Sequence, residues 1–160
     1  MNAWANFFVA IAGAAAALTG LIFVGVSISL KQVLEATHLT GRALESLFLL
    51  MTNLFAAMIC LMPSQSSLAV GIELGILSVF IWVLTLVMDV RMLRAAAPAL
   101  KLHYRRNMVF SQLAMLPYIA GSIAIMNEGF TGLFWLVPGI IFSFIKALMD
   151  AWVLLVEIHR

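Results

Sequence analysis

Charged residues are scarce in this chain. Asp, Glu, Lys and Arg together make up 10% of its 160 residues, whereas hydrophobic residues make up 64%. Soluble domains carry roughly 25% charged residues, and a mean hydropathy of +1.12 lies far on the apolar side. This composition excludes an ordinary water-soluble domain, because such a fold would leave most of its apolar surface in water. It predicts a protein that is solvated by lipid.

Cysteine is nearly absent, and recognisable catalytic motifs are absent altogether. The single Cys60 excludes an intrachain disulfide, and its apolar neighbours predict a buried packing residue. The three histidines lie outside the apolar runs, which excludes a bis-histidine haem inside the bilayer, and no zinc-ligand spacing occurs. No nucleophile has a base at recognisable spacing, and no glycine-rich phosphate loop is present. We therefore expect neither an enzyme, nor a cofactor or metal, nor a nucleic-acid partner.

Long apolar runs dominate what is present. A hydrocarbon core of about 30 Å requires roughly 20 apolar residues in a helix. Five runs approach or exceed that length, at residues 7–30, 44–62, 68–88, 108–126 and 133–156. The first run is too long for the core of a signal peptide, and no Lys or Arg precedes it. The sequence predicts an all-α fold: one domain over residues 1–160, with five transmembrane helices.

The basic residues predict the orientation of these helices. Lys and Arg accumulate in cytoplasmic loops. The connections 63–67 and 127–132 contain neither residue, whereas the two alternate connections contain Lys31, Arg42, Arg91, Arg94, Lys101, Arg105 and Arg106. We therefore expect the N-terminus outside and the C-terminus inside. The run 18–30 is similar to stretches in small bacterial membrane proteins, which implies a plasma membrane of the bacterial inner type.

The segment 89–107 combines basic and apolar residues. Arg91, Arg94, Lys101, Arg105 and Arg106 alternate with leucine, methionine and tyrosine, and Pro98 interrupts the pattern. Such a segment is typical of chain lying against anionic lipid headgroups, with about 1 kcal/mol of attraction per basic residue. The alternative is that these residues only determine the topology.

Small residues form strips on two of the predicted helices. The first helix has Ala12, Gly13, Ala16, Ala17 and Gly20, and the third has Gly71 and Gly75 four residues apart. Strips of this kind allow helix backbones to approach closely in lipid. They predict close packing within the chain, with the first helix at an inner or an oligomer-facing position. Since a chain of 17.5 kDa encloses little volume alone, we expect a homo-oligomer.

Polar residues inside the predicted helices are the candidates for function, because ionisable groups in a bilayer are costly. Lys146 and Asp150 lie one turn apart and can pair within their helix. Asn53 and Tyr118 occur at similar depth, and Glu45 lies nearer the inner end. These side chains could converge on one hydrated cavity, or they could form an interhelical clamp. Glu73 stands apart near the outer surface, where it could reach the headgroups or line an oligomeric vestibule.

Two functions remain open on the sequence alone. The polar residues and the small-residue strips favour an oligomeric channel or small carrier for an ion or a proton. The scarcity of polar residues and the lack of a selectivity motif favour instead an accessory or regulatory subunit of another membrane complex.

Overall fold

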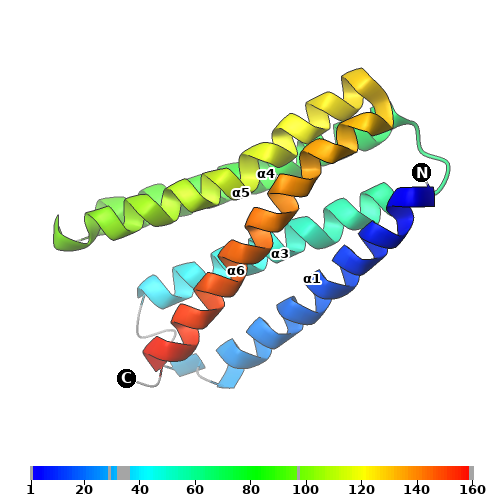
Figure 1. Ribbon diagram of the computed structural model, residues 1–160. Coiled ribbons are helices and arrows are strands. Elements are labelled where there is room, and N and C mark those ends of the chain that lie inside the picture. Colours follow the sequence, from blue (N-terminus) through cyan, green and yellow to red (C-terminus); the bar gives the residue numbers. More distant parts are fainter. Residues whose placement is uncertain (1, 29, 32–36, 97, 159–160) are drawn as a thin grey trace.

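The computed structural model describes residues 2–28, 30–31, 37–96 and 98–158, and side chains within these ranges except at 2–3, 37–39, 99 and 154–158. Every long element in this part of the chain is a helix, and it contains no strand (Figure 1). The α-helices are α1 (Asn2–Ile28), α3 (Thr37–Leu61), α4 (Ser67–Ala95), α5 (Lys101–Glu128) and α6 (Leu136–Ile158). Two 3-10 helices, η1 (Pro98–Leu100) and η2 (Gly129–Trp135), flank α5. The predicted all-α class is confirmed.

The helices extend beyond most ends of the apolar runs. α3 begins seven residues before the run at 44–62, and α4 continues seven residues past the run at 68–88. A helix end that leaves the lipid can carry polar residues. Hydropathy therefore identifies the lipid-buried part of a helix better than the residues at which the helix begins and ends. At the start of α4, Ser66 caps the helix by accepting a hydrogen bond from the Ala69 backbone N–H at 3.2 Å.

Four stretches of the described chain are long and apolar enough to cross a membrane. They are Trp4–Ile28, Thr40–Leu61, Ser67–Ala95 and Lys101–Val153. The fourth is a continuous helical stretch of 53 residues that contains α5, η2 and α6. The structure therefore supports a polytopic helical membrane protein. Neither a count of five crossings nor their orientation follows from it.

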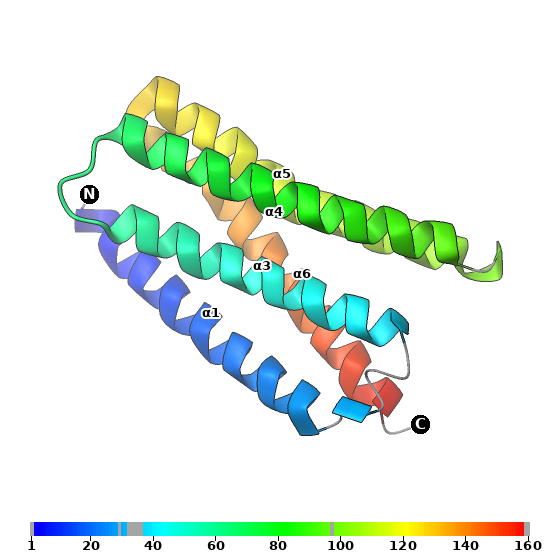
Figure 2. The ribbon, with the colours of Figure 1, turned by 180° about the vertical axis from the view of Figure 1, so that it is seen from behind.

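The helices form a bundle with two different ends (Figures 1 and 2). α4 and α5 make a long hairpin, α1 lies along α3, and α6 crosses over α3 and α5. The N-terminus, the connection between α3 and α4, and η2 lie toward one end, which we call the N-terminal end. The connection between α4 and α5 and the last turns of α6 lie toward the opposite end. We call this the basic end, because Arg42, Arg91, Arg94, Lys101, Arg105 and Arg106 belong to the helix ends found there.

The basic segment 89–107 forms the tip of the helical hairpin made by α4 and α5. It is not an extended segment that lies along the surface. α4 continues to Ala95 and α5 begins at Lys101, so that only a short connection with η1 separates them. The connection expected between the runs at 68–88 and 108–126 is therefore much shorter than residues 89–107, because α4 and α5 both continue toward Pro98. The five basic side chains of the hairpin are exposed, and their contact with lipid headgroups stays a prediction.

The two small-residue strips have different environments. A Cβ atom on Gly71 would lie 2.5 Å from Met126 Cγ and 3.0 Å from the Ser122 backbone oxygen, so α4 packs tightly on α5 at this point. On α1, Ala15 is buried against the bundle, whereas Gly13, Ala16, Ala17 and Gly20 are exposed. Nothing lies within 4 Å of a Cβ atom placed on Gly13 or Gly20. Of the two positions expected for α1, the inner one does not hold within a single chain, because α1 packs mainly on α3. The oligomer-facing position stays a prediction.

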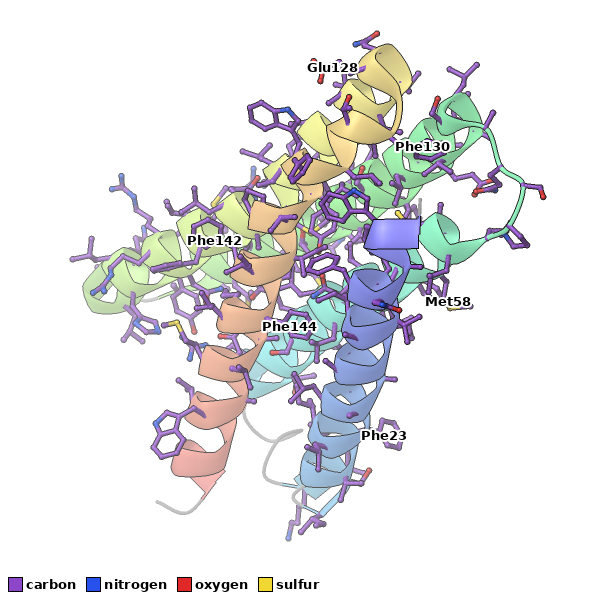
Figure 3. The ribbon with its side chains drawn as sticks, turned by 45° about the vertical axis from the view of Figure 1, so that its right-hand side comes forward. Phe23, Met58, Glu128, Phe130, Phe142 and Phe144 are labelled. Atoms are coloured by element: carbon purple, nitrogen blue, oxygen red, sulfur yellow. The ribbon has the colours of Figure 1, made fainter. Side chains whose placement is uncertain are left out.

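Apolar side chains fill the bundle near its N-terminal end and cover its outside. The core there contains Phe8, Leu74, Ile125, Leu136 and Ile140, all of which are at most 2% exposed. Large apolar side chains such as Phe23 and Met58 project outward, as Figure 3 shows. A bundle with apolar residues both inside and outside is the arrangement that lipid favours.

Candidate functional site

Five charged side chains are buried between α3, α4, α5 and α6. They are Arg42 and Glu45 from α3, Asp89 from α4, and Lys146 and Asp150 from α6, and none is more than 7% exposed. We call them the charged cluster. Burying a charge is costly unless it is paired and hydrogen-bonded. Five such groups at one level of a membrane bundle therefore mark its candidate functional site.

Lys146 is at the centre of the cluster. Its Nζ lies 3.2 Å from Glu45 Oε2, and it also donates to Asp150 Oδ2 one turn along the same helix. The predicted pair of Lys146 and Asp150 is therefore present, and it is part of a larger network. Lys146 joins α6 to α3, so that one cation serves two carboxylates.

Glu45 has the most complete set of partners in the cluster. Besides Lys146, its carboxylate accepts a hydrogen bond from Asn107 Nδ2 at 3.0 Å and another from Ser111 Oγ. Asn107 and Ser111 both come from α5, one turn apart. Charge-assisted hydrogen bonds of this kind hold a carboxylate in one geometry.

Asp89 differs from Glu45 because one of its oxygens is orphaned. The side chain is 3% exposed, and Oδ2 has no hydrogen-bond partner among the described residues. The Asp89 carboxyl group interacts electrostatically with Glu45 and Lys146, and the polar side chains of Ser111 and Asn107 lie near it. A buried polar atom without a partner is exceptional in folded proteins and calls for a physical explanation.

A second polar layer lies next to the cluster, toward the N-terminal end. Tyr118 of α5 donates to Asn53 Oδ1 of α3, and Ser143 of α6 lies 3.5 Å from the tyrosine oxygen. All three side chains are at most 1% exposed, and Asn53 Nδ2 has no partner among the described residues. We call these three residues the amide–hydroxyl layer. It links α3, α5 and α6, one to two turns away from the charged cluster.

A pocket of about 200 Å³ opens beside the charged cluster at the basic end. Arg42, Lys146 and Asp150 form its buried wall, and the exposed His103 and Arg106 of α5 lie at its rim. Arg42 donates a hydrogen bond to His103 Nε2 across this space. We call it the basic pocket. A second pocket of about 150 Å³ lies at the N-terminal end, among Trp4, Phe8, Cys60 and Leu133.

The structure divides the predicted polar residues into three places. Lys146, Asp150 and Glu45 meet in the charged cluster, whereas Asn53 and Tyr118 meet in the amide–hydroxyl layer. Asn53 and Tyr118 do not line the basic pocket, so this pocket is not the single cavity expected around all of the predicted polar residues. Glu73 lies away from both places, on α4 near the N-terminal end. There it accepts two hydrogen bonds from Gln65 Nε2, at 2.9 and 3.1 Å.

Sequence reasoning missed several members of the site. Arg42, Asp89 and Asn107 fell outside the predicted helices, which ended too early, and Ser111 was left out although it lies within the run at 108–126. One signal was available: His103, Asn107 and Ser111 follow one another at intervals of four residues, which places them on one helix face. Their partners on α3 could not be found without the relative positions of the two helices.

No metal site accounts for the cluster among the residues described. No three His, Cys, Asp or Glu side chains there are arranged so that they could hold a metal ion. Comparisons with protein-family models, curated proteins and solved structures find no match. Any functional assignment must therefore come from the chemistry of the site.

Proposed function

We propose that this protein is a small carrier or channel for an ion or a proton, and that the charged cluster is its binding site. One observation supports this most strongly: among the described residues, three carboxylates are buried together with two cations, and Asp89 Oδ2 has no hydrogen-bond partner. A cluster that only clamped helices together would be expected to satisfy each of its polar atoms.

The charge balance of the cluster favours a positively charged ligand. With all five side chains ionised, one negative charge is in excess in a region of low dielectric constant. A proton or a monovalent cation taken up at Asp89 would remove this excess. Lys146 would then be free to shift between Glu45 and Asp150, since it contacts both. Binding at one carboxylate would in this way change the contacts between α3 and α6.

The surroundings of the cluster favour a carrier over an open channel. The basic pocket leads to the cluster from one end, whereas apolar side chains such as Phe8, Leu74 and Ile140 fill the bundle toward the other. An ion could pass this core only if helices moved. Pro117 of α5 lies beside the amide–hydroxyl layer and leaves the Leu113 carbonyl without its helical N–H donor, so it is a natural hinge.

We propose five membrane crossings with the N-terminus outside and the C-terminus inside, in a plasma membrane of the bacterial inner type. α5 and α6 are 28 and 23 residues long, so each is long enough to cross alone. η2 reverses the chain between them (Figure 1). The described Lys and Arg side chains of the helix ends gather at the basic end, which would then face the cytoplasm and its anionic lipids.

We further propose that the functional unit is a homo-oligomer that forms through α1. The exposed Gly13, Ala16, Ala17 and Gly20 make one side of α1 nearly flat, and such a surface suits close helix contact in lipid. Glu73 could line a vestibule in such an assembly. Replacing Gly20 by Leu should then reduce the oligomer in crosslinking experiments and leave the folded monomer intact.

The same exposed side of α1 supports the alternative function. It could bind a transmembrane helix of another complex, and the protein would then be an accessory subunit that transports nothing. The two functions differ in what the purified protein does in liposomes. A carrier or channel should dissipate a gradient of protons, sodium, potassium or chloride. Liposomes that stay as tight as protein-free ones for all four ions would support the accessory function.

A further inference from the structure

Arg42 is a buried cation without a carboxylate partner among the described residues. Its side chain is 7% exposed, and it donates a hydrogen bond to His103 Nε2. The nearby carboxylates of Glu45 and Asp150 both pair with Lys146 instead. A guanidinium carries five N–H donors, so Arg42 has donors left for a ligand in the basic pocket that it lines.

The wall of this pocket carries an excess of positive charge. Arg42, Arg106 and Lys146 line it, and Asp150 is the one acidic residue among its described lining residues. Because Lys146 is already bound to Asp150, the two guanidinium groups form no ion pair with a carboxylate among the described residues. They come from different helices, α3 and α5, and they face one space. Paired guanidinium groups recognise phosphate through parallel N–H donors.

The rest of the lining favours a phosphate that is attached to a lipid. Phe110, Met149 and Val153 complete the pocket, and Phe110 and Met149 are exposed at its edge. An apolar edge next to basic residues suits a phospholipid, whose phosphate lies beside its glycerol and acyl chains. Free phosphate needs only the basic residues. The volume of about 200 Å³ leaves room for a phosphate group with part of a headgroup.

We propose that the basic pocket binds a phosphate group through Arg42 and Arg106, and that an anionic phospholipid supplies it. This site is distinct from general attraction of lipid to the exposed basic residues of the α4–α5 hairpin. Arg105 gives a direct comparison. It is the neighbour of Arg106 and carries the same charge, but it lines a separate apolar groove with Leu93, Gln112 and Leu116. The proposal does not depend on transport.

The test is the affinity of the full-length protein for phosphatidylglycerol in detergent, measured by native mass spectrometry, with phosphatidylcholine and inorganic phosphate as the other two probes. Arg106→Gln should weaken phosphatidylglycerol binding about tenfold or more, which is the loss expected when a charge-assisted hydrogen bond to a phosphate oxygen is removed. Arg105→Gln should leave the affinity within twofold of the wild type. Arg42→Gln should have an effect at least as large as Arg106→Gln. If it does not fold, the comparison of Arg106→Gln with Arg105→Gln decides by itself.

Competition identifies the source of the phosphate. A lipid site would be supported if the wild type retains phosphatidylglycerol in millimolar inorganic phosphate and Arg106→Gln does not bind it. Displacement by inorganic phosphate, with the same loss in Arg106→Gln, would keep the phosphate site and overturn its assignment to lipid. Equal losses in Arg105→Gln and Arg106→Gln would overturn the proposal, and so would equal affinity for phosphatidylglycerol and phosphatidylcholine.

Discussion

Lys146 connects the two buried carboxylates with which it pairs, so the charged cluster depends on one side chain. Its ammonium group lies 3.2 Å from Glu45 and also contacts Asp150. Removal of one partner from a buried ion pair costs more than replacement of both, because a single removal leaves an unpaired charge in low dielectric. Substitutions in this network can therefore distinguish the effect of an unpaired buried charge from the effect of altered packing.

Lys146→Met should destabilise the folded protein by about 3–5 kcal/mol, because it leaves two carboxylates without their cation. The double variant Lys146→Met with Asp150→Leu should recover part of this loss, since Glu45 keeps its bonds to Asn107 and Ser111. The measurement is the folded fraction in detergent after heating, followed by size-exclusion chromatography. Equal stability of the single and double variants would show that the pair does not stabilise the bundle.

Tyr118 provides a second test at this scale. Tyr118→Phe removes the donor to Asn53 Oδ1 and leaves a buried amide oxygen unpaired, so the variant should lose about 1–3 kcal/mol of stability. Tyr104 is the other tyrosine of the chain and is half-buried near the basic end. Tyr104→Phe is therefore the control and should change the thermal midpoint little. A loss in Tyr104→Phe as large as that in Tyr118→Phe would contradict the assigned hydrogen bond.

At the scale of elements, η2 determines how α6 returns along α5. Gly132 lies so close to the backbone of α5 that a Cβ atom there would approach Ile125 Cα to 2.8 Å. A backbone atom cannot move aside as a flexible side chain can. The absence of a side chain at Gly132 is thus a condition for the tight return of the chain.

Gly132→Ala should therefore reduce the yield of folded protein severely, whereas Gly13→Ala should not. Both substitutions add one methyl group, but the methyl at Gly13 would meet nothing within 4 Å. The yield of monodisperse protein after extraction in mild detergent measures the difference. Similar yields for the two variants would show that η2 does not pack on α5 as described.

The sequence predicted the helices far better than their contacts. Hydropathy located the centre of every long helix, because burial in lipid depends on local composition. It failed at the helix ends, where α4 and α5 continue through the basic residues around Pro98. The bond between Lys146 and Asp150 was predictable because it lies within one helix. The bonds of Glu45 to α5 and α6 were not, since they depend on how three helices align.

At the scale of the whole molecule, the two ends of the bundle differ in charge, and this difference predicts the topology. Labelling of introduced cysteines in a Cys60→Ala background checks this topology. Thr131→Cys in η2 should react with a membrane-impermeant maleimide in intact cells, whereas Leu102→Cys in α5 should react only after permeabilisation. Both positions are exposed. The reverse pattern would contradict the orientation with the N-terminus outside.

The most direct test of the central claim is ion flux through reconstituted protein with single carboxylates neutralised. Asp89→Asn and Asp150→Asn should each change the rate at which an imposed proton or cation gradient decays by about tenfold or more, because a buried charge on the path controls a barrier of several kcal/mol. Glu128→Gln is the control, since Glu128 is exposed at the end of α5, away from the cluster. We predict flux in the wild type, the same flux in Glu128→Gln, and altered flux in the two aspartate variants. Wild-type liposomes as tight as protein-free ones, or equal flux in all four proteins, would contradict the claim.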